Sequence, residues 1–111
     1  MTVFQKIIDG EIPSKKLYED DDVLAFLDIQ PQAPFHALVV PKKPIESMAL
    51  ASEEDCALIG KVMLVAAQVA REGGLDDDGY RLVTNIGNQG GQTVFHLHVH
   101  VLGGRSMGSM G

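Results

Sequence analysis

The segment that decides the fold reads GGQTVFHLHVHVL and covers residues 90–102. It carries three of the four histidines of the chain, His96, His98 and His100, each separated from the next by one apolar residue. Side chains alternate between the two faces of a β-strand, so this spacing predicts a strand over 95–102 with all three imidazoles on one face. The apolar residues between them would then pack on the other face against a helix.

The patterns outside this segment predict a small α+β domain. Apolar residues at helical spacing, with Ser52 as N-cap and Gly73 at the end, predict a long amphipathic helix over 52–72. Because neighbouring strands have short connections, we expect one domain over 1–111, an antiparallel sheet of about five strands with helices on one face. Turn signals delimit a short helix over 4–9 and strands over 16–19, 23–28, 36–40 and 80–85.

The composition is that of an acidic globular protein. The chain has 111 residues, a formal net charge of −6 and a single cysteine, Cys56, which excludes an intramolecular disulfide. Nucleic-acid binding normally needs a basic patch, so the acidic balance argues against it.

No apolar run reaches the ~20 residues of a membrane span. The N-terminus also lacks the pattern of a signal peptide, so we expect a cytoplasmic protein with no membrane partner.

Three interpretations of the histidines have to be weighed. They could form the polar face of a half-buried strand, although three imidazoles in strict alternation are an unusual choice for a merely solvated face. They could bind a metal ion, but no Asp, Glu or Cys stands near them in the sequence. They could act on phosphorus, because a neutral imidazole is a nucleophile and a protonated one neutralises phosphoryl oxygens. The preceding segment 90–93 offers glycine amides and a hydroxyl to an anion, and the residues favour this third interpretation.

The sequence His96-Leu97-His98-Val99-His100-Val101-Leu102 matches the pattern of the histidine triad (HIT) family, which the chain resembles over nearly its whole length. It is most similar to the Hint branch, the purine nucleoside phosphoramidases. The resemblance implies a HIT-like fold and hydrolysis of the P–N bond of purine nucleoside 5′-phosphoramidates, of the adenosine type, through a covalent nucleotidyl-histidine intermediate. The other matching segments are His36 and residues 6–8, 11–13, 18–20, 25–29, 31–34, 41–43, 79–81 and 102–105.

Two alternatives to this activity remain. Dinucleoside polyphosphate hydrolases share the triad but not the Gly-Gly-Arg that follows it here at residues 103–105. The chain could also be a nucleotide-binding interaction module whose hydrolysis is vestigial.

The resemblance also implies roles for individual residues. His98 would be the nucleophile and His100 would contact the phosphoryl oxygens, with His96 and His36 as a supporting imidazole pair. Asp28 would accept the ribose hydroxyls. The apolar base slot would consist of Phe4, Ile7, Phe26, Leu27 and Ile29, and the phosphate pocket of Asn85, Gly91, Gln92 and Thr93, with Thr93 near the leaving nitrogen.

The resemblance also leads to expectations about metals and partners. Many relatives have a Cys-x-x-Cys in a structural zinc site where this chain has VFQK at residues 3–6, so we expect no such zinc and no other metal or cofactor. The expected partners are purine nucleoside monophosphate derivatives and a second copy of the chain. The family is dimeric, and the helix over 52–72 is apolar on more than one face, with Val62 and Val65 as candidate interface positions. The tail over 106–111 lacks the aromatic residue of relatives, so their leaving-group preference is not carried over.

Overall fold

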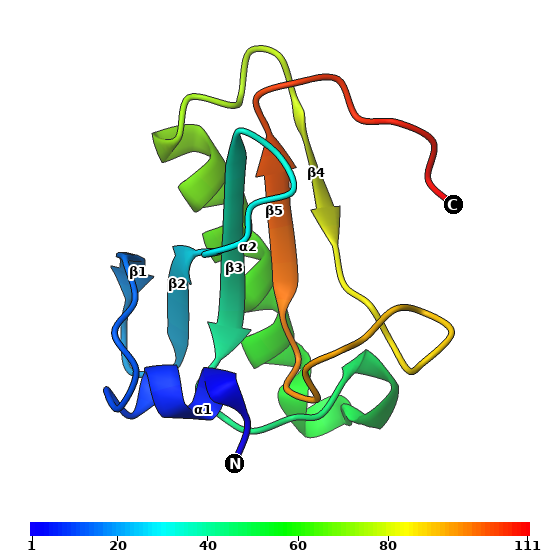
Figure 1. Cartoon of the computed structure of the whole chain (residues 1–111). Helices are drawn as coiled ribbons and strands as arrows, with labels where there is room; N and C mark the ends of the chain where they lie inside the picture. The colour runs from blue at the N-terminus through cyan, green and yellow to red at the C-terminus, as the bar shows by residue number, and fades with distance from the viewer.

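A computed structural model describes all 111 residues and has an α+β fold built on one five-stranded antiparallel sheet (Figure 1). The strand order is β1-β2-β3-β5-β4, and every neighbouring pair is antiparallel. The expected fold class, with one long and one short helix, is therefore confirmed. The elements in chain order are α1 (Val3–Ile8), β1 (Lys16–Glu19), β2 (Val23–Leu27), β3 (Phe35–Pro41), two short 3₁₀ turns (Met48–Leu50 and Glu53–Asp55), α2 (Cys56–Glu72), β4 (Tyr80–Val83) and β5 (Val99–Gly103).

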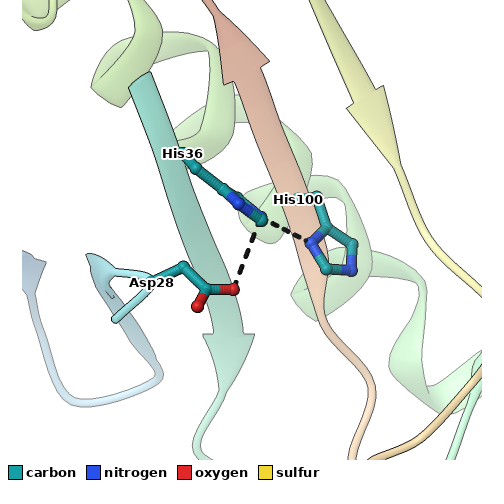
Figure 2. Close-up of side chains that lie close together, drawn as sticks. All are labelled: Asp28, His36 and His100. Carbon is teal, nitrogen blue, oxygen red and sulfur yellow. Dashed lines mark hydrogen bonds and ion pairs between the residues drawn. The ribbon is translucent and has the colours of Figure 1, made fainter. Parts of the chain in front are cut away.

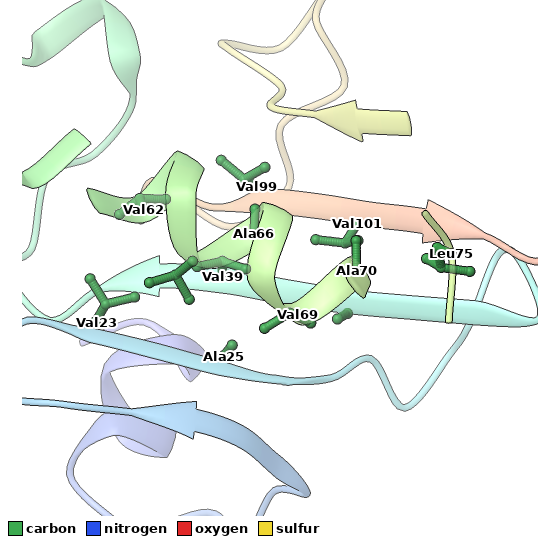
Figure 3. Packing of buried hydrophobic residues seen from close by; sticks show 12 residues of the cluster. Val23, Ala25, Val39, Val62, Ala66, Val69, Ala70, Leu75, Val99 and Val101 are labelled. Carbon is green, nitrogen blue, oxygen red and sulfur yellow. The ribbon is translucent and has the colours of Figure 1, made fainter. Parts of the chain in front are cut away.

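The long helix α2 covers one face of the sheet (Figure 3). A capping box formed by Ser52 and Asp55 satisfies free amides just before the helix begins. Lys43 pairs with the Asp55 carboxylate at 2.6 Å and so ties this end to the segment after β3. The buried stripe of α2 meets the odd-numbered residues of the central strands. This core comprises Val62, Val65, Ala66, Val69 and Ala70 of α2 with Val23, Ala25, Ala37, Val39, Val99, Val101 and Leu75.

Val62 and Val65 belong to this core, where they are almost completely buried. Their selection as interface positions was therefore wrong, because they occupy the stripe that α2 turns toward its own sheet. The solvent-facing stripe of α2 includes Ala57, Gly60 and Leu64, of which Leu64 is 74% exposed.

The short helix α1 lies against the opposite face of the sheet (Figure 1). Phe4 and Ile7 of α1 pack on the even-numbered residues of β2 and β3, which are Leu24, Phe26, Leu38 and Val40. The expectation that both helices share one face is therefore wrong. The physical reason is that β2 and β3 are apolar on both faces, so each face needs its own cover.

The last strand is shorter than its alternating pattern predicts. β5 begins at Val99, so only His100 of the triad lies within it, and His96 and His98 belong to the extended segment before it. Side chains occupy the backbone carbonyls that would continue the ladder: Thr84 Oγ1 donates to the His98 carbonyl at 2.8 Å, and His96 Nε2 donates to the Pro41 carbonyl at 2.7 Å. Pro41 also has no N–H to offer a further rung.

No helix in the structure has both the length and the apolar character needed to cross a membrane.

Candidate active site

A pocket of about 370 Å³ opens on the sheet face opposite α2, between α1 and the two central strands. Nine of its 16 lining residues are hydrophobic, and the six polar ones are two histidines, an aspartate, a glutamine, a serine and a threonine. Such a mixture of apolar walls and few polar groups is typical of a small-molecule site. The lining residues are Val3, Phe4, Ile7, Ile12, Pro13, Ser14, Phe26, Leu27, Asp28, Ile29, Gln30, Leu38, Thr93, Val94, His98 and His100.

His98 lines this pocket with one of its two ring nitrogens committed to the protein. Its Nδ1 lies 2.7 Å from the His96 carbonyl oxygen, which can only accept, so Nδ1 carries the ring proton and donates it. The proton of a neutral imidazole cannot be on both nitrogens, so Nε2 keeps a free lone pair. The edge-to-face contact with Phe4, at a centroid distance of 4.8 Å, holds the ring plane. His98 is therefore a buried imidazole whose Nε2 is available as a base or nucleophile.

His100 has the opposite tautomer, set through His36 (Figure 2). The Gln32 amide donates to His36 Nδ1 at 3.0 Å, which leaves the His36 proton on Nε2. His36 Nε2 then donates to His100 Nδ1 at 2.9 Å, so the His100 proton must be on Nε2. His98 and His100, whose ring centroids are 5.0 Å apart, thus give the pocket a lone pair and an N–H donor side by side.

Asp28 brings a carboxylate to these histidines from the turn after β2 (Figure 2). One carboxylate oxygen lies 3.5 Å from His36 Nε2, and the other accepts from the Gln30 amide at 2.8 Å. The ligand-type atoms of Asp28, His36 and His100 lie within 4.8 Å of one another, which is a spacing that a metal ion could use. The Gln32 amide works against it: with His36 Nδ1 as acceptor, His36 Nε2 is protonated and has no lone pair for a metal.

The histidine pairing differs from the one that the resemblance implied. His36 pairs with His100 and not with His96. His96 is 1% exposed, does not line the pocket, and donates from Nε2 to the Pro41 carbonyl. Its backbone carbonyl, not its ring, is what contacts His98.

Of the residues in and near the glycine-rich loop, some hold the loop itself and one lines the pocket. The buried amide of Gln92 donates to the carbonyls of Glu46 and Val94 and accepts from the Gly87 amide, so its polar atoms are already used inside the protein. Asn85 Nδ2 donates to the Gly90 carbonyl. Of the four residues expected to line a phosphate pocket, only Thr93 lines the cavity described here; Asn85, Gly91 and Gln92 do not. The sequence motif could not reveal that its amides hold the loop itself.

The five residues expected to form the base slot all line the pocket. Phe4, Ile7 and Phe26 form its buried wall, whereas Ile29 is 91% exposed and lies at the rim. The segment Ile12-Pro13-Ser14 also lines the pocket, although the sequence assigned it no role in binding. Ser14 adds a hydroxyl whose oxygen is buried without a hydrogen-bond partner, in a slot that was expected to be purely apolar.

Burial lowers the pKa of all four imidazoles, most clearly of His100, whose pKa falls to about 4. Desolvation is the largest cause in each case, because it penalises the charged ring. For His100, repulsion from His98 and His36 adds to it, and attraction to Asp28 only partly opposes it. The expected pair of a neutral and a charged imidazole is therefore absent near pH 7. A bound phosphate would bring the opposite charge and raise these pKa values again.

Comparisons with known proteins agree on one family. The family model described as HIT domain matches residues 9–107. An uncharacterized HIT-like protein of Synechocystis is 54% identical over 104 residues, which cover 94% of this chain and 90% of that protein. A HIT family hydrolase of Legionella pneumophila superposes with a TM-score of 0.95 at 44% identity, covering 97% of this chain and 96% of that one. A histidine triad nucleotide-binding protein of Candida albicans gives a TM-score of 0.82 at 28% identity, covering 98% and 86%.

Lowering the pH below about 6.5 is expected to destabilise the protein. Burial lowers the pKa of the imidazoles in the folded chain, to about 4 for His100, whereas an unfolded histidine titrates near ~6.5. Between these values the unfolded chain binds more protons, so the free energy of unfolding falls as the pH falls through this window. Below about pH 4, where His100 is also charged in the folded chain, its contribution is lost completely.

Denaturant unfolding between about pH 8 and pH 4 measures this dependence. A His100→Asn variant lacks one titrating group and is expected to take up about one proton fewer on unfolding near pH 5. Carboxylates contribute equally to the pH dependence of both proteins, so the difference between the two pH slopes reports on His100. Identical pH slopes for the two proteins would contradict the prediction.

Proposed function

The chain belongs to the HIT domain family, and we propose that it is a nucleotide hydrolase that cleaves the P–N bond of purine nucleoside 5′-phosphoramidates. The observation that carries this proposal is the pair of opposite tautomers in the pocket. His98 Nε2 is a buried lone pair, and His100 Nε2–H is a donor next to it. A nucleophile and an oxyanion donor are the two groups that attack on a phosphoryl centre requires.

The proposed reaction has two steps at phosphorus. His98 Nε2 attacks and forms a P–N bond, while the bond to the leaving amine breaks and its electron pair departs on the amine nitrogen, which takes a proton from water. Thr93, which lines the pocket, would donate a hydrogen bond to this nitrogen. A water molecule then attacks phosphorus, the bond to Nε2 breaks, and the hydrolysis releases a nucleoside monophosphate, a proton and neutral His98.

The carbonyl of His96 supports the covalent intermediate. When Nε2 is bonded to phosphorus, the His98 ring is a cation whose remaining proton is on Nδ1. That proton is hydrogen-bonded to the His96 carbonyl at 2.7 Å before the reaction begins, so no group has to move to stabilise the charge. His100 Nε2–H would donate to a phosphoryl oxygen, and the negative charge there would favour a protonated His100.

The rest of the pocket suits a purine nucleoside. A planar base would pack between Phe4, Ile7 and Phe26, where binding follows the apolar area buried and so favours the larger purine. Each oxygen of Asp28 still has a lone pair beyond its present contact, so the carboxylate can accept both ribose hydroxyls. The Candida relative is named as a nucleotide-binding protein, which is consistent with this assignment.

We also propose that the protein acts as a homodimer. The solvent-facing stripe of α2 carries Leu64 at 74% exposure and the partly exposed Met63, beside the small residues Ala57 and Gly60 that allow close approach. An apolar stripe that its own sheet does not need is the kind of surface at which a two-fold pair meets itself.

Replacing His98 with alanine is expected to lower kcat for adenosine 5′-phosphoramidate by at least about 1,000-fold, because the covalent route is lost. The affinity for AMP should change little, since the slot and Asp28 remain. Amine release measures the first quantity and calorimetry the second. Wild-type protein treated with a strong chelator serves as the metal control and should keep full activity.

Two results would contradict this proposal. Wild-type protein that binds AMP but releases no amine would instead be a binding module. Faster cleavage of diadenosine tetraphosphate than of the phosphoramidate would favour the alternative hydrolase activity.

Replacing Asp28 with asparagine is expected to weaken AMP binding by about 1.5–3 kcal/mol, the usual range for a hydrogen bond to a charged group. The analogue that lacks both ribose hydroxyls is the matched control and should bind wild type and variant almost equally. Calorimetry with both ligands gives the comparison. Equal weakening of the two ligands would show that Asp28 acts through His36 and not on the ribose.

Replacing Leu64 with glutamate is expected to convert a micromolar dimer into a monomer, because each copy would place a charge in an apolar contact. Leu50→Glu is the matched control, since Leu50 is also exposed, at 65%, but lies outside α2. Sedimentation velocity distinguishes the two states. A wild-type protein that sediments as a monomer would end the dimer proposal.

A further inference from the structure

Arg105, which follows β5, reaches back to the loop between β2 and β3. Its Nη2 donates to the Gln32 carbonyl at 2.9 Å, and its Nη1 donates to the Ser106 carbonyl at 3.0 Å. The adjoining Gly104, with φ of 92°, approaches Pro34 so closely that a Cβ there would lie 2.8 Å from the proline ring. Two neighbouring residues after β5 therefore fix the same loop, although neither lines the pocket.

The loop residue that Arg105 holds is the one that sets the His36 tautomer. The Gln32 carbonyl accepts from Arg105 and the Gln32 amide donates to His36 Nδ1, so both backbone polar groups of Gln32 are engaged. From His36 the chain of donors continues to His100 Nδ1. Three consecutive hydrogen bonds thus connect an exposed guanidinium with an imidazole of the pocket.

The hydrogen bonds between these groups can run in two directions, and each direction is self-consistent. In the state described here, Gln32 N–H faces His36 Nδ1, His36 donates from Nε2 to His100, and His100 donates from Nε2 toward the pocket. If the Gln32 amide turned away, His36 could carry its proton on Nδ1. Its Nε2 would then accept from His100 Nδ1–H, and His100 would turn a bare lone pair toward the phosphoryl oxygens, where it would repel them. Only the first state gives the pocket an imidazole N–H donor.

We propose that Arg105 is a positioning residue that keeps His100 protonated on Nε2 by holding Gln32 in place. Arg105 does not contact the substrate and acts through the hydrogen bonds that run from Gln32 to His36 and from His36 to His100. The consequence for catalysis rests on the proposed function, whereas the tautomers themselves can be observed in the ligand-free protein.

The first test measures the tautomers without any substrate. Long-range ¹H–¹⁵N NMR of histidine side chains at about pH 7.5 should show His36 and His100 protonated on Nε2 in the wild type. In Arg105→Ala, both rings should shift toward the Nδ1-protonated form, and Arg105→Lys, which keeps one donor, should restore part of the wild-type pattern. His98, whose proton is held by the His96 carbonyl, should be unchanged in both variants.

Arg81→Ala is the matched control. Arg81 is a second arginine that donates to a backbone carbonyl, that of Gly108 at 2.8 Å, but no histidine follows in its chain of contacts. This variant should leave all histidine tautomers as in the wild type. If Arg105→Ala keeps the wild-type tautomers, or if Arg81→Ala shifts them equally, the proposal is overturned.

The second test uses activity. Arg105→Ala is expected to lower kcat for the phosphoramidate roughly fivefold to tenfold, about the effect of one ordinary hydrogen bond. KM should change much less, because the donor of His100 matters most in the transition state. A rise in KM with unchanged kcat would assign Arg105 to the rim of the binding site and overturn the positioning role. A wild type without phosphoramidase activity would refute the proposed function, and the NMR comparison would still decide the role of Arg105.

Discussion

A neutral imidazole has one nitrogen that donates and one that accepts, and the site depends on this constraint. The four histidines are buried or half-buried, and the charged form of each is disfavoured because it would lose its hydration. Once the rings are neutral, the protein chooses their tautomers with backbone groups whose character is fixed. A carbonyl holds the proton of His98 on the side away from the pocket, and an amide acting through His36 sends the proton of His100 toward it. Two chemically identical side chains thereby acquire opposite roles.

The sheet makes this arrangement stable by dividing its two faces between packing and chemistry. The odd-numbered residues of β2 and β3 are sealed by α2, and the even-numbered ones pack on α1 only as far as the edge of the pocket. Asp28 comes after β2, His36 lies on β3 and His100 on β5, so three strands that are adjacent in the sheet bring His100 next to two residues that precede it by more than 60 positions (Figure 2). The order β1-β2-β3-β5-β4 is what makes the contact between His36 and His100 available.

The sequence allowed prediction of what depends on local periodicity. The helical spacing of the apolar residues over 52–72 identified α2, and the alternating histidines identified a segment that carries the candidate chemistry. The sequence did not allow prediction of the hydrogen-bond partners of polar side chains, because these partners are distant in the sequence. The Gln92 amide looks like an anion ligand until its partners at residues 46, 87 and 94 are known. The sequence placed His36 in the site but did not identify His100 as its hydrogen-bond partner. The sheet face that α1 covers became clear only when β2 and β3 were seen to be apolar on both faces.

The late start of β5 also means that His98 and His100 are held in different ways. The ladder between β3 and β5 ends at the pair Val39 and Val99, so the segment that carries His98 is held by a few individual hydrogen bonds and not by cooperative strand pairing. In the proposed reaction, a small adjustment of the His98 backbone would therefore break no rung of the ladder between β3 and β5. Strand pairing thus supports His100, whereas individual hydrogen bonds and close packing support His98.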